Sequence, residues 1–139
     1  MSLITPLKQF FALSLIMTSL LSTFALAADE ENTAQPAYVE LTPDFIVNYT
    51  TASNRLKYIK TSITLQTDVS HEAIIQDNMP LIRDALVMFL SSRTDEQVSG
   101  AQAREKTREE AAVAVNAAMK AETNQEPVKS VLFASFLTQ

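Results

Sequence analysis

The chain begins with a segment that limits how much of it can fold as a domain. Residues 10–28 form a run of nineteen without a charge, which lies between Lys8 and three acidic residues at 29–31. As a helix with a rise of about 1.5 Å per residue, the run would reach roughly 28 Å, close to the hydrocarbon thickness of a bilayer. However, residues 25–27 read Ala-Leu-Ala, the small-x-small pattern of a signal-peptidase site. Residues 1–28 are therefore expected to be either a transmembrane anchor or a cleaved signal peptide.

Both alternatives place the remainder of the chain on the far side of the membrane. Lys8 is the only charge before the run, and positively charged flanks stay in the cytoplasm. About 110 residues remain, which is enough for one compact domain but not for two. Residues 29–37 are acidic and polar without periodicity, so we expect a linker there and a single domain over residues 38–139.

The composition of this remainder excludes several kinds of site. Sixteen acidic residues face ten basic ones once Lys8 is subtracted from the eleven, and this negative balance argues against nucleic acid as a partner. The chain has no cysteine, which excludes disulfides and thiol chemistry. Gly100 is the only glycine, whereas phosphate-binding loops of the Walker or dinucleotide type need several.

Three strands are predicted from β-branched and alternating residues. Residues 45–51 are β-branched and aromatic, with Pro43 at their start, and residues 56–67 alternate between a mainly apolar and a polar face. With a turn at residues 52–55, these segments predict an antiparallel hairpin. Residues 128–139 return to a strand pattern and are apolar on both faces near their centre, which predicts a central place in the sheet.

Two main helices are predicted between the hairpin and the last strand, which gives an α+β domain with an antiparallel sheet. The first is expected to begin with Ser70 as its N-cap, and Pro80 predicts either a kink or a short helix before a longer one that starts at Pro80. Its apolar stripe is expected to be core rather than interface, and consists of Ile75, Met79, Ile82, Leu86, Phe89 and Leu90. Residues 91–100 are polar and turn-like.

The second helix is predicted over residues 101–122, which are rich in strong helix formers. One narrow stripe of mostly small residues would let it lie close to its support: Thr107, Ala111, Ala114, Val115, Ala118 and Met119. Acidic and basic residues alternate elsewhere on it, which is typical of a solvated, ion-paired face: Arg104, Glu105, Lys106, Arg108, Glu109 and Glu110.

Catalytic chemistry is not predicted for this chain. His71 is the only histidine, and no second imidazole or thiol exists to complete a metal site or a nucleophile and base pair. We therefore expect His71 to be structural or exposed. No catalytic, cofactor-binding or metal-binding residue is assigned, and the protein is expected not to be an enzyme.

The order and spacing of three segments resemble the FliL family of flagellar basal-body proteins. They read LTPDFIVN at residues 41–48, RLKYIKTSITL at 55–65 and MPLIRDAL at 79–86, followed by LSS at 90–92. The closing helix and strand extend the resemblance, which covers essentially residues 38–139. The positions that carry it are Phe45, Asn48, Tyr58, Pro80, Arg83, Asp84, Asn116, Phe133, Phe136 and Gln139.

The resemblance implies a fold, a place and a role. The domain would have the α+β fold of stomatin-like (SPFH-like) domains and would stand in the bacterial periplasm, at the flagellar basal body, behind a single-pass inner-membrane anchor. It would be a non-enzymatic accessory protein without a cofactor, would form homo-oligomeric rings around the stator, and would support flagellar rotation, swarming and chemotaxis. This also shifts the expectation for residues 1–28 toward a retained anchor.

A charged helix edge is the predicted contact surface. Arg83, Asp84 and Arg93 border the apolar stripe of the first helix and are expected to contact a stator component or a second subunit. The alternative is a soluble periplasmic binding or chaperone-like module that holds a hydrophobic ligand with its hairpin and helices. Cell fractionation beside a marker truncated at Ala28 separates these readings, because only the anchored protein stays full length in the inner membrane.

Overall fold

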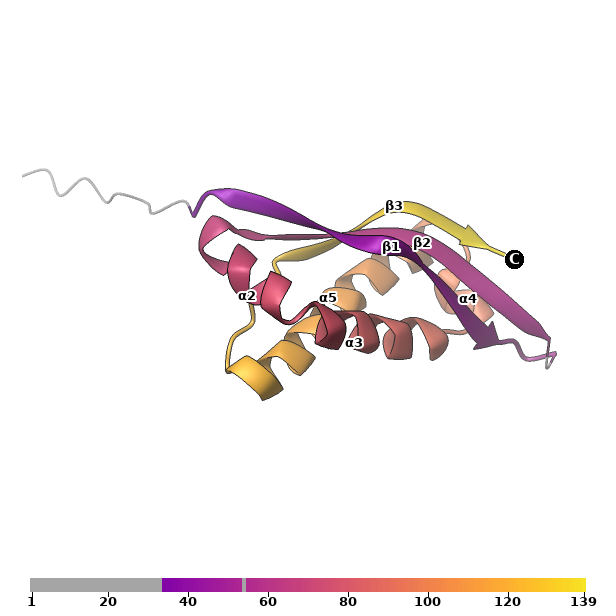
Figure 1. Cartoon of the computed structure of the whole chain (residues 1–139). Helices are drawn as coiled ribbons and strands as arrows, with labels where there is room; N and C mark the ends of the chain where they lie inside the picture. Colours follow the sequence, from indigo (N-terminus) through magenta and orange to yellow (C-terminus); the bar gives the residue numbers. More distant parts are fainter. Residues whose placement is uncertain (1–33, 54) are drawn as a thin grey trace, which may run out of the picture. The chain divides into compact units, whose positions relative to one another are not determined.

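The computed structural model describes residues 34–53 and 55–139, and within them it confirms the α+β class (Figure 1). The hairpin, the helices and the returning strand follow one another as the sequence predicts. The elements in chain order are β1 (Pro36–Thr50), β2 (Leu56–Asp68), a 3₁₀ turn η1 (Val69–His71), α2 (Glu72–Asp77), α3 (Met79–Ser91), α4 (Asp95–Val98), α5 (Ala101–Thr123) and β3 (Ser130–Thr138).

The three strands form one antiparallel sheet in the order β1-β2-β3, with the helices gathered on one of its faces (Figure 1). The prediction that the last strand is central was wrong, because β2 is central and β3 lies at an edge. The helix-facing side of β3 packs on the core through Val131, Phe133 and Phe136, whereas Leu132 and Leu137 face away from it and are exposed. Apolar residues on both faces of β3 therefore did not indicate whether it has one neighbouring strand or two.

β1 is longer than the sequence predicted, since it begins at Pro36, inside the segment expected to be a linker. The pairing register with β2 shifts between Leu41 and Phe45, so residues 42–44 of β1 lie opposite Ser62 alone. Pro43 stands in this bulge, where a missing ladder donor costs little. The break in alternation that the bulge produces hid the first half of the strand from periodicity.

The helical region divides at Asn78, which separates α2 from α3. Pro80 lies in the first turn of α3, where its missing N–H is not needed, and this confirms the second of the two alternatives for that proline. Ser70 is not the N-cap, because it lies within the 3₁₀ turn and the N-cap of α2 is His71.

α4 is a short helix inside the segment expected to be a turn. Thr94 and Gln97 form its capping box. The backbone N–H of Thr94 donates to Oε1 of Gln97, and the side chain of Thr94 accepts from the backbone N–H of Gln97. Gly100 then has φ 87°, a conformation that favours glycine, and serves as the N-cap of α5. Asn124 ends α5 in the left-handed conformation at φ 58°.

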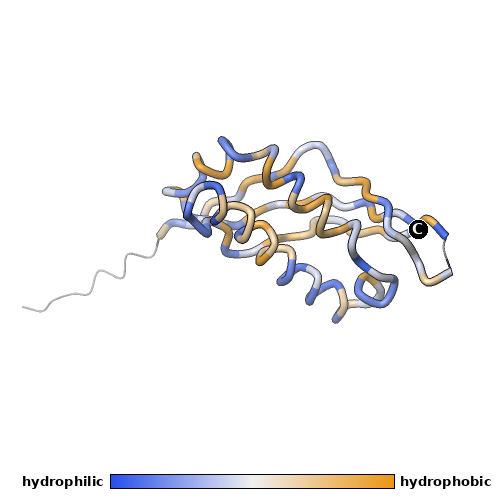
Figure 2. Tube along the Cα trace, turned by 90° about the horizontal axis from the view of Figure 1, so that it is seen from below, coloured by the Kyte–Doolittle hydropathy of each residue, from blue (hydrophilic) through white to orange (hydrophobic). Residues whose placement is uncertain are grey.

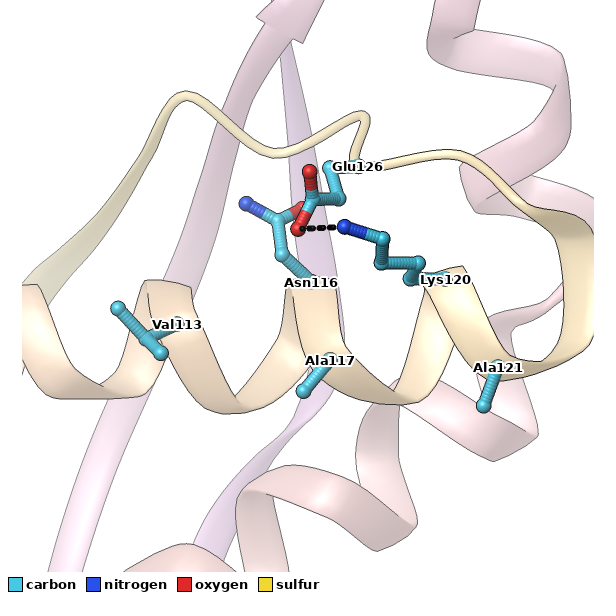
Figure 3. A pocket seen from close by; sticks show the side chains of 6 residues that line it. All are labelled: Val113, Asn116, Ala117, Lys120, Ala121 and Glu126. Carbon is cyan, nitrogen blue, oxygen red and sulfur yellow. Dashed lines mark ion pairs between the residues drawn. The ribbon is translucent and has the colours of Figure 1, made fainter.

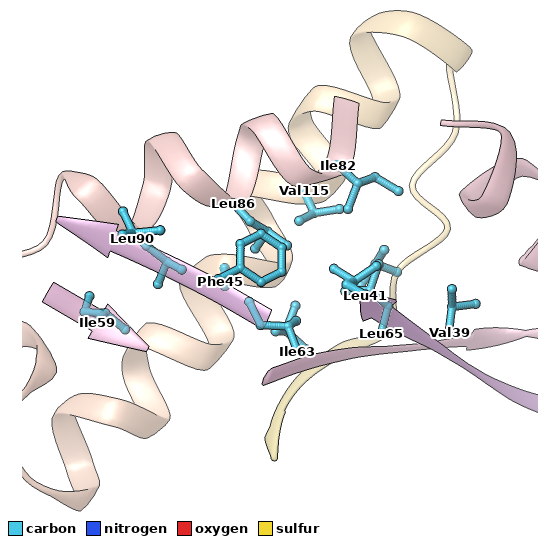
Figure 4. Packing of buried hydrophobic residues seen from close by; sticks show 14 of the residues in the cluster. Val39, Leu41, Phe45, Ile59, Ile63, Leu65, Ile82, Leu86, Leu90 and Val115 are labelled. Atoms are coloured by element: carbon cyan, nitrogen blue, oxygen red, sulfur yellow. The ribbon is translucent and has the colours of Figure 1, made fainter. Parts of the chain in front are cut away.

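One hydrophobic core fills the space between the sheet and the helices, as the close view of its side chains shows (Figure 4). α3 supplies Ile82, Leu86 and Leu90, and α5 supplies Ala111, Val115 and Met119 with Thr107. The first predicted stripe is therefore confirmed as core. In the second, Thr107, Ala111, Val115 and Met119 are buried, whereas Ala114 and Ala118 are half-buried. Seen from the helix side, the trace alternates between hydrophobic and hydrophilic residues along the helices, as amphipathic packing requires (Figure 2).

Among residues 34–53 and 55–139, we find no helix with the length and apolar character needed to cross a bilayer. The predicted anchor or signal peptide at residues 1–28 lies outside the described part of the chain, as does most of the predicted linker. Their assignment stays a prediction.

Candidate functional site

Arg83, the first predicted contact residue, is engaged inside the domain. Its guanidinium carbon lies 4.2 Å from the centroid of the Phe45 ring, which β1 holds in the core. A cation over an aromatic face contributes about 0.5 to 2 kcal/mol, more as water is excluded. Its Nη1 is buried without a hydrogen-bond partner in the described domain. Arg83 therefore fastens α3 to β1, and its Nη1 is not available at the surface.

Arg93 is also used within the fold. Its guanidinium carbon lies 4.2 Å from the centroid of the Phe89 ring, and its Nη1 donates to Oε2 of Glu110 at 2.5 Å. Only 13% of the side chain is exposed. The residue links the end of α3 to α5, so Glu110 is a tertiary partner as well as a member of the predicted solvated face.

Asp84 is the predicted contact residue that faces solvent. Val87, Met88 and Ser91 follow it at helical spacing and are exposed on the same side of α3. The structure therefore does not bring Arg83, Asp84 and Arg93 together as one charged edge. Instead it leaves an outward strip of α3 with one carboxylate and two apolar side chains.

The ion-paired face of α5 is solvated only in part. Arg104, Lys106 and Glu109 are exposed as predicted. Arg108 pairs with Glu105, and hydrogen bonds from its guanidinium hold the pKa of that carboxyl below its ordinary value. Its Nη1 also donates to Oγ of Ser130 at 2.5 Å, which ties α5 to β3. Spacing along the helix indicated the pair of Glu105 and Arg108, but it could not indicate the contact of Arg108 with Ser130.

Several of the family-like positions support the architecture around β3. The side chain of Asn116 donates to the carbonyl of Val128 at 2.7 Å and accepts from its N–H at 3.0 Å, so one amide fixes the approach to the strand. The rings of Phe133 and Phe136 lie 5.1 Å apart between centroids at an interplanar angle of 49°. These residues position the last strand and do not form a reactive centre.

Three further family-like positions lie in one row across the sheet. Tyr58 pairs with Asn48 in the register between β1 and β2. Its hydroxyl donates to Oε1 of Gln139 at 2.7 Å, and the two residues exchange backbone hydrogen bonds of 2.8 and 3.1 Å. The row lies on the face of the sheet that carries no helix, and it leaves polar groups at the surface.

A buried phenol anchors the tip of the hairpin to α4. Tyr49 donates to Oδ1 of Asp95 at 3.0 Å, and Nζ of Lys57 donates to the same oxygen at 3.0 Å. Burial, aided by the neighbouring carboxylate, raises the pKa of Tyr49 to about 12. The hydrogen bond from Lys57 lowers the pKa of Asp95. Tyr49 and Lys57 are cross-strand partners in the hairpin, whereas Asp95 lies 46 and 38 residues further along the chain, so no local pattern could have revealed its contact with them.

An open groove of about 450 Å³ runs along α5 beside the segment that leads to β3 (Figure 3). Val113, Ala117 and Ala121 line it with small or exposed apolar side chains, and Lys120 pairs with Glu126 at 3.4 Å across it. Lys120 and Glu126 are the ionisable side chains of this lining, and they pair with each other.

Residues 34–53 and 55–139 contain no group of three side chains placed to hold a metal ion. His71 is half-buried, and its Nδ1 lies 3.9 Å from Oδ2 of Asp68, which also pairs with Lys129. The pair of Asp68 and Lys129 joins the end of β2 to the residue before β3, and the His71 side chain, 40% exposed, lies beside it.

Comparison with known families gives the frame for these surfaces. No curated protein matches the sequence. The family described as flagellar basal body-associated protein FliL matches residues 38–139, a span that contains β2, β3, all the helices and nearly all of β1. This match covers well over half of the chain and confirms the resemblance inferred from the sequence. The chain belongs to the FliL family of flagellar basal body-associated proteins.

Proposed function

We propose that this protein is an accessory subunit of the bacterial flagellar motor that contacts the stator and supports rotation, swarming and chemotaxis. The observation that carries the proposal is the family match over residues 38–139. The family is one of flagellar accessory proteins and is not a known enzyme family. A domain whose aromatic, charged and amide side chains mostly serve packing is consistent with a role in assembly.

The proposed location is the inner membrane, with the domain in the periplasm and residues 1–28 as the anchor. The length of the uncharged run and the single positive charge before it support this orientation. A stomatin-like (SPFH-like) domain and a homo-oligomeric ring around the stator are part of the same proposal. The α+β architecture is compatible with that fold.

The proposed contact edge keeps the residues predicted from sequence, with the roles that their surroundings support. Asp84 is the residue that meets the partner, beside the exposed Val87 and Met88. Arg83 and Arg93 set the position of α3 behind it through their aromatic and carboxylate contacts. An apolar strip with one charge is suited to a specific contact, because the charge penalises a shifted partner.

Deletion of the gene tests the proposed role. Motor rotation under viscous load and the diameter of swarming colonies should both fall, and a copy with a fluorescent protein fused before Met1 should form foci at flagellar motors. Unchanged motility under high load together with diffuse fluorescence would overturn the proposal. Fractionation beside a marker truncated at Ala28 should show full-length protein in the inner membrane, whereas a shortened soluble form would favour a periplasmic binding module.

A pair of charge reversals tests the contact edge. Asp84→Lys should reduce swarming without loss of the folded protein, because it changes an exposed side chain on the strip of α3. Asp77→Lys is the control, since Asp77 is also an exposed aspartate but ends α2 and is not part of α3. Equal swarming in both variants would remove Asp84 from the contact.

A further inference from the structure

The outer edge of β3 is open along its second half. In an antiparallel ladder, alternate residues point their N–H and C=O groups away from the partner strand. Gln139 exchanges backbone hydrogen bonds with β2, so Thr138 and Phe136 direct these groups outward. Arg108 already donates to the carbonyl of Val131 and covers the first part of the edge. The remaining ladder groups are a template for an added extended segment.

The surface beside this edge is positively charged. An open groove of about 320 Å³ lies between residues 133–136 of β3 and the beginning of α5. Arg104 lines it with an exposed side chain, which takes no part in the ion pairs of the residues that the structure describes. Arg108 also lines it and is paired with Glu105. The first turn of α5 adds positive potential, because it has no acidic residue and its N-cap is Gly100. The groove therefore suits a segment that carries carboxylates.

The strands of a second copy do not match this groove. Residues 130–139 carry no charge, so a second β3 offers nothing to Arg104. In β1 both neighbours of Glu40 are buried, so this carboxylate points to the face of the sheet without helices, whereas Arg104 lies on the helix side. Asp44 lies in the bulge with Pro43, where the ladder of β1 is interrupted.

An acidic segment stands directly before the sheet in the sequence. Residues 29–33 read Asp-Glu-Glu-Asn-Thr, and in an extended conformation Asp29 and Glu31 would share one face. Both alternatives for residues 1–28 keep this segment in the mature chain. We propose that residues 29–33 of one copy add to the outer edge of β3 in a neighbouring copy. Asp29 and Glu31 then meet Arg104 and the start of α5.

Chain length selects a second copy over the same copy as the donor. A segment outside β3 would lie three strand spacings from β1, which is about 14 Å. The chain from Ala34 back to Glu31 spans at most about 11 Å. Because β1 and β3 are opposite edges of the sheet, the contact is head-to-tail and repeats from copy to copy, as a ring requires. The inference rests on the homo-oligomeric ring of the proposed function and names a contact within it.

Cysteine pairs test the contact in the full-length protein in membranes, because the native chain has no cysteine. One tagged copy carries Glu30→Cys or Asn32→Cys. A second copy with a different tag carries Ala134→Cys, at an exposed position that lines the groove. Mild oxidation should join the two tags at one or both donor positions, since thiols on paired strands come within bonding reach. The matched acceptor control is Ala121→Cys, at an exposed alanine of α5 outside this groove.

A chain that carries Ala134→Cys together with the better donor cysteine separates the modes of pairing. Head-to-tail contact should give covalent dimers, trimers and longer species. Products that stop at the dimer, or a disulfide within one chain, would overturn the proposal. The absence of a disulfide between the two tags, or an equal yield with Ala121→Cys, would overturn it as well. If cross-linking fails while the fluorescent fusion still forms foci at motors, this contact is removed and the motor role is kept.

Charge reversal tests the part of Arg104. Arg104→Glu on the acceptor copy should lower the disulfide yield at least about tenfold, because the donor carboxylates then meet a like charge. Lys106→Glu is the matched control, since Lys106 is exposed on α5 outside this groove, and the yield should stay within about twofold.

A neutral donor shows whether the two charges meet. With Asp29→Asn and Glu31→Gln on the donor copy, Arg104→Glu should change the yield by no more than about twofold, because the interaction that it breaks is already gone. Circular dichroism of each variant reports retention of the fold. An equal effect of Arg104→Glu on the native and neutral donors would contradict the proposed pairing of charges.

Discussion

β1 and β3 are both edge strands, yet the domain holds them by different forces. β1 buries its inner face in the core with Val39, Leu41, Phe45, Val47 and Tyr49. β3 buries Val131 fully and keeps two half-buried rings. Side chains of α5 hold its start through Arg108 and the segment before it through Asn116. Burial of apolar surface tolerates small displacements, whereas hydrogen bonds need the strand in one register.

The difference predicts which part of the sheet opens first. Segments with few buried apolar side chains open locally at a lower free energy than the core. β3 is therefore expected to separate from β2 more readily than β1 does. The variants below test whether β1 and β3 contribute to stability in these different ways.

The largest effect is expected at the centre of β1. Phe45→Ala should lower the free energy of unfolding by about 3 to 5 kcal/mol, because a fully packed ring is lost and a cavity remains. Phe136→Ala, on β3, should cost far less because its ring is half-buried. Denaturant unfolding followed by circular dichroism measures both. Equal losses would show that the two strands share the core equally.

The next effect concerns the hydrogen bonds that fix β3. Asn116→Ala should cost about 2 kcal/mol, because the N–H and the carbonyl of Val128 both lose their partner and Val128 is buried. Asn48→Ala is the matched control, with an expected change within about 0.5 kcal/mol, since Asn48 is exposed on β1. Hydrogen exchange should also speed up in β3 of the Asn116 variant but not in β1. A uniform increase would contradict a local role.

Alkaline pH should weaken the end of β1 that is tied to α4. The pKa of Tyr49 is about 12 in the folded protein against 10.0 for an ordinary tyrosine. Between these values the unfolded chain releases a proton that the folded one keeps, so stability is complete below pH 10 and falls as pH rises toward 12. Unfolding midpoints measured across this range should fall for the native chain and stay flatter for Tyr49→Phe. Parallel profiles would mean that the phenol is accessible.

The cluster of Tyr49, Lys57 and Asp95 should also lose stability at acid pH. The pKa of Asp95 is lowered in the folded state, chiefly by the hydrogen bond from Lys57, so its contribution is present above the ordinary value of 3.8 and is lost as pH falls below it. The effect is small because both partners are partly exposed. Lys57→Met should reduce this acid dependence, and the hydrogen bond from Tyr49 should keep part of it, as unfolding midpoints measured at acid pH would show.

The smallest effect is expected where β1 meets α3. Arg83→Met should change stability by less than about 1 kcal/mol, since it keeps contact with Phe45 and removes a buried Nη1 that has no partner. Arg83→Ala should be worse than Arg83→Met, because it loses the packing as well. A large loss in both variants would show that the charge itself holds α3 on the strand.

Local patterns predicted the elements whose signals are local. The alternation that begins at Leu56 gave β2, and the helix formers after Gly100 gave α5 nearly to its ends. α4 carried a readable signal, the capping box of Thr94 and Gln97, but its four residues are too few for a periodicity. The first half of β1 was missed because Pro43 and the bulge interrupt its alternation.

Tertiary contacts could not be predicted in the same way. The order of strands depends on pairing between distant segments, so the composition of β3 gave no measure of its neighbours. Arg93 and Phe89 are one turn apart and their contact was within reach of spacing arguments, whereas Arg83 meets Phe45 only through the packing of α3 on β1. The resemblance to the family was inferred from the order and spacing of whole segments, and no single residue would have been enough.

Gly100, between α4 and α5, has a backbone conformation that suits a D-amino acid better than an L-amino acid. Gly100 has φ 87°, and open space surrounds the point where a β-carbon would stand. An L-alanine there would be strained by its backbone and not by its neighbours, whereas a D-alanine would take this conformation naturally. A semisynthetic chain with D-alanine at position 100 would keep the start of α5 and would have a less varied unfolded state. D-alanine at position 100 should therefore make the domain more stable than glycine does, whereas L-alanine should make it less stable.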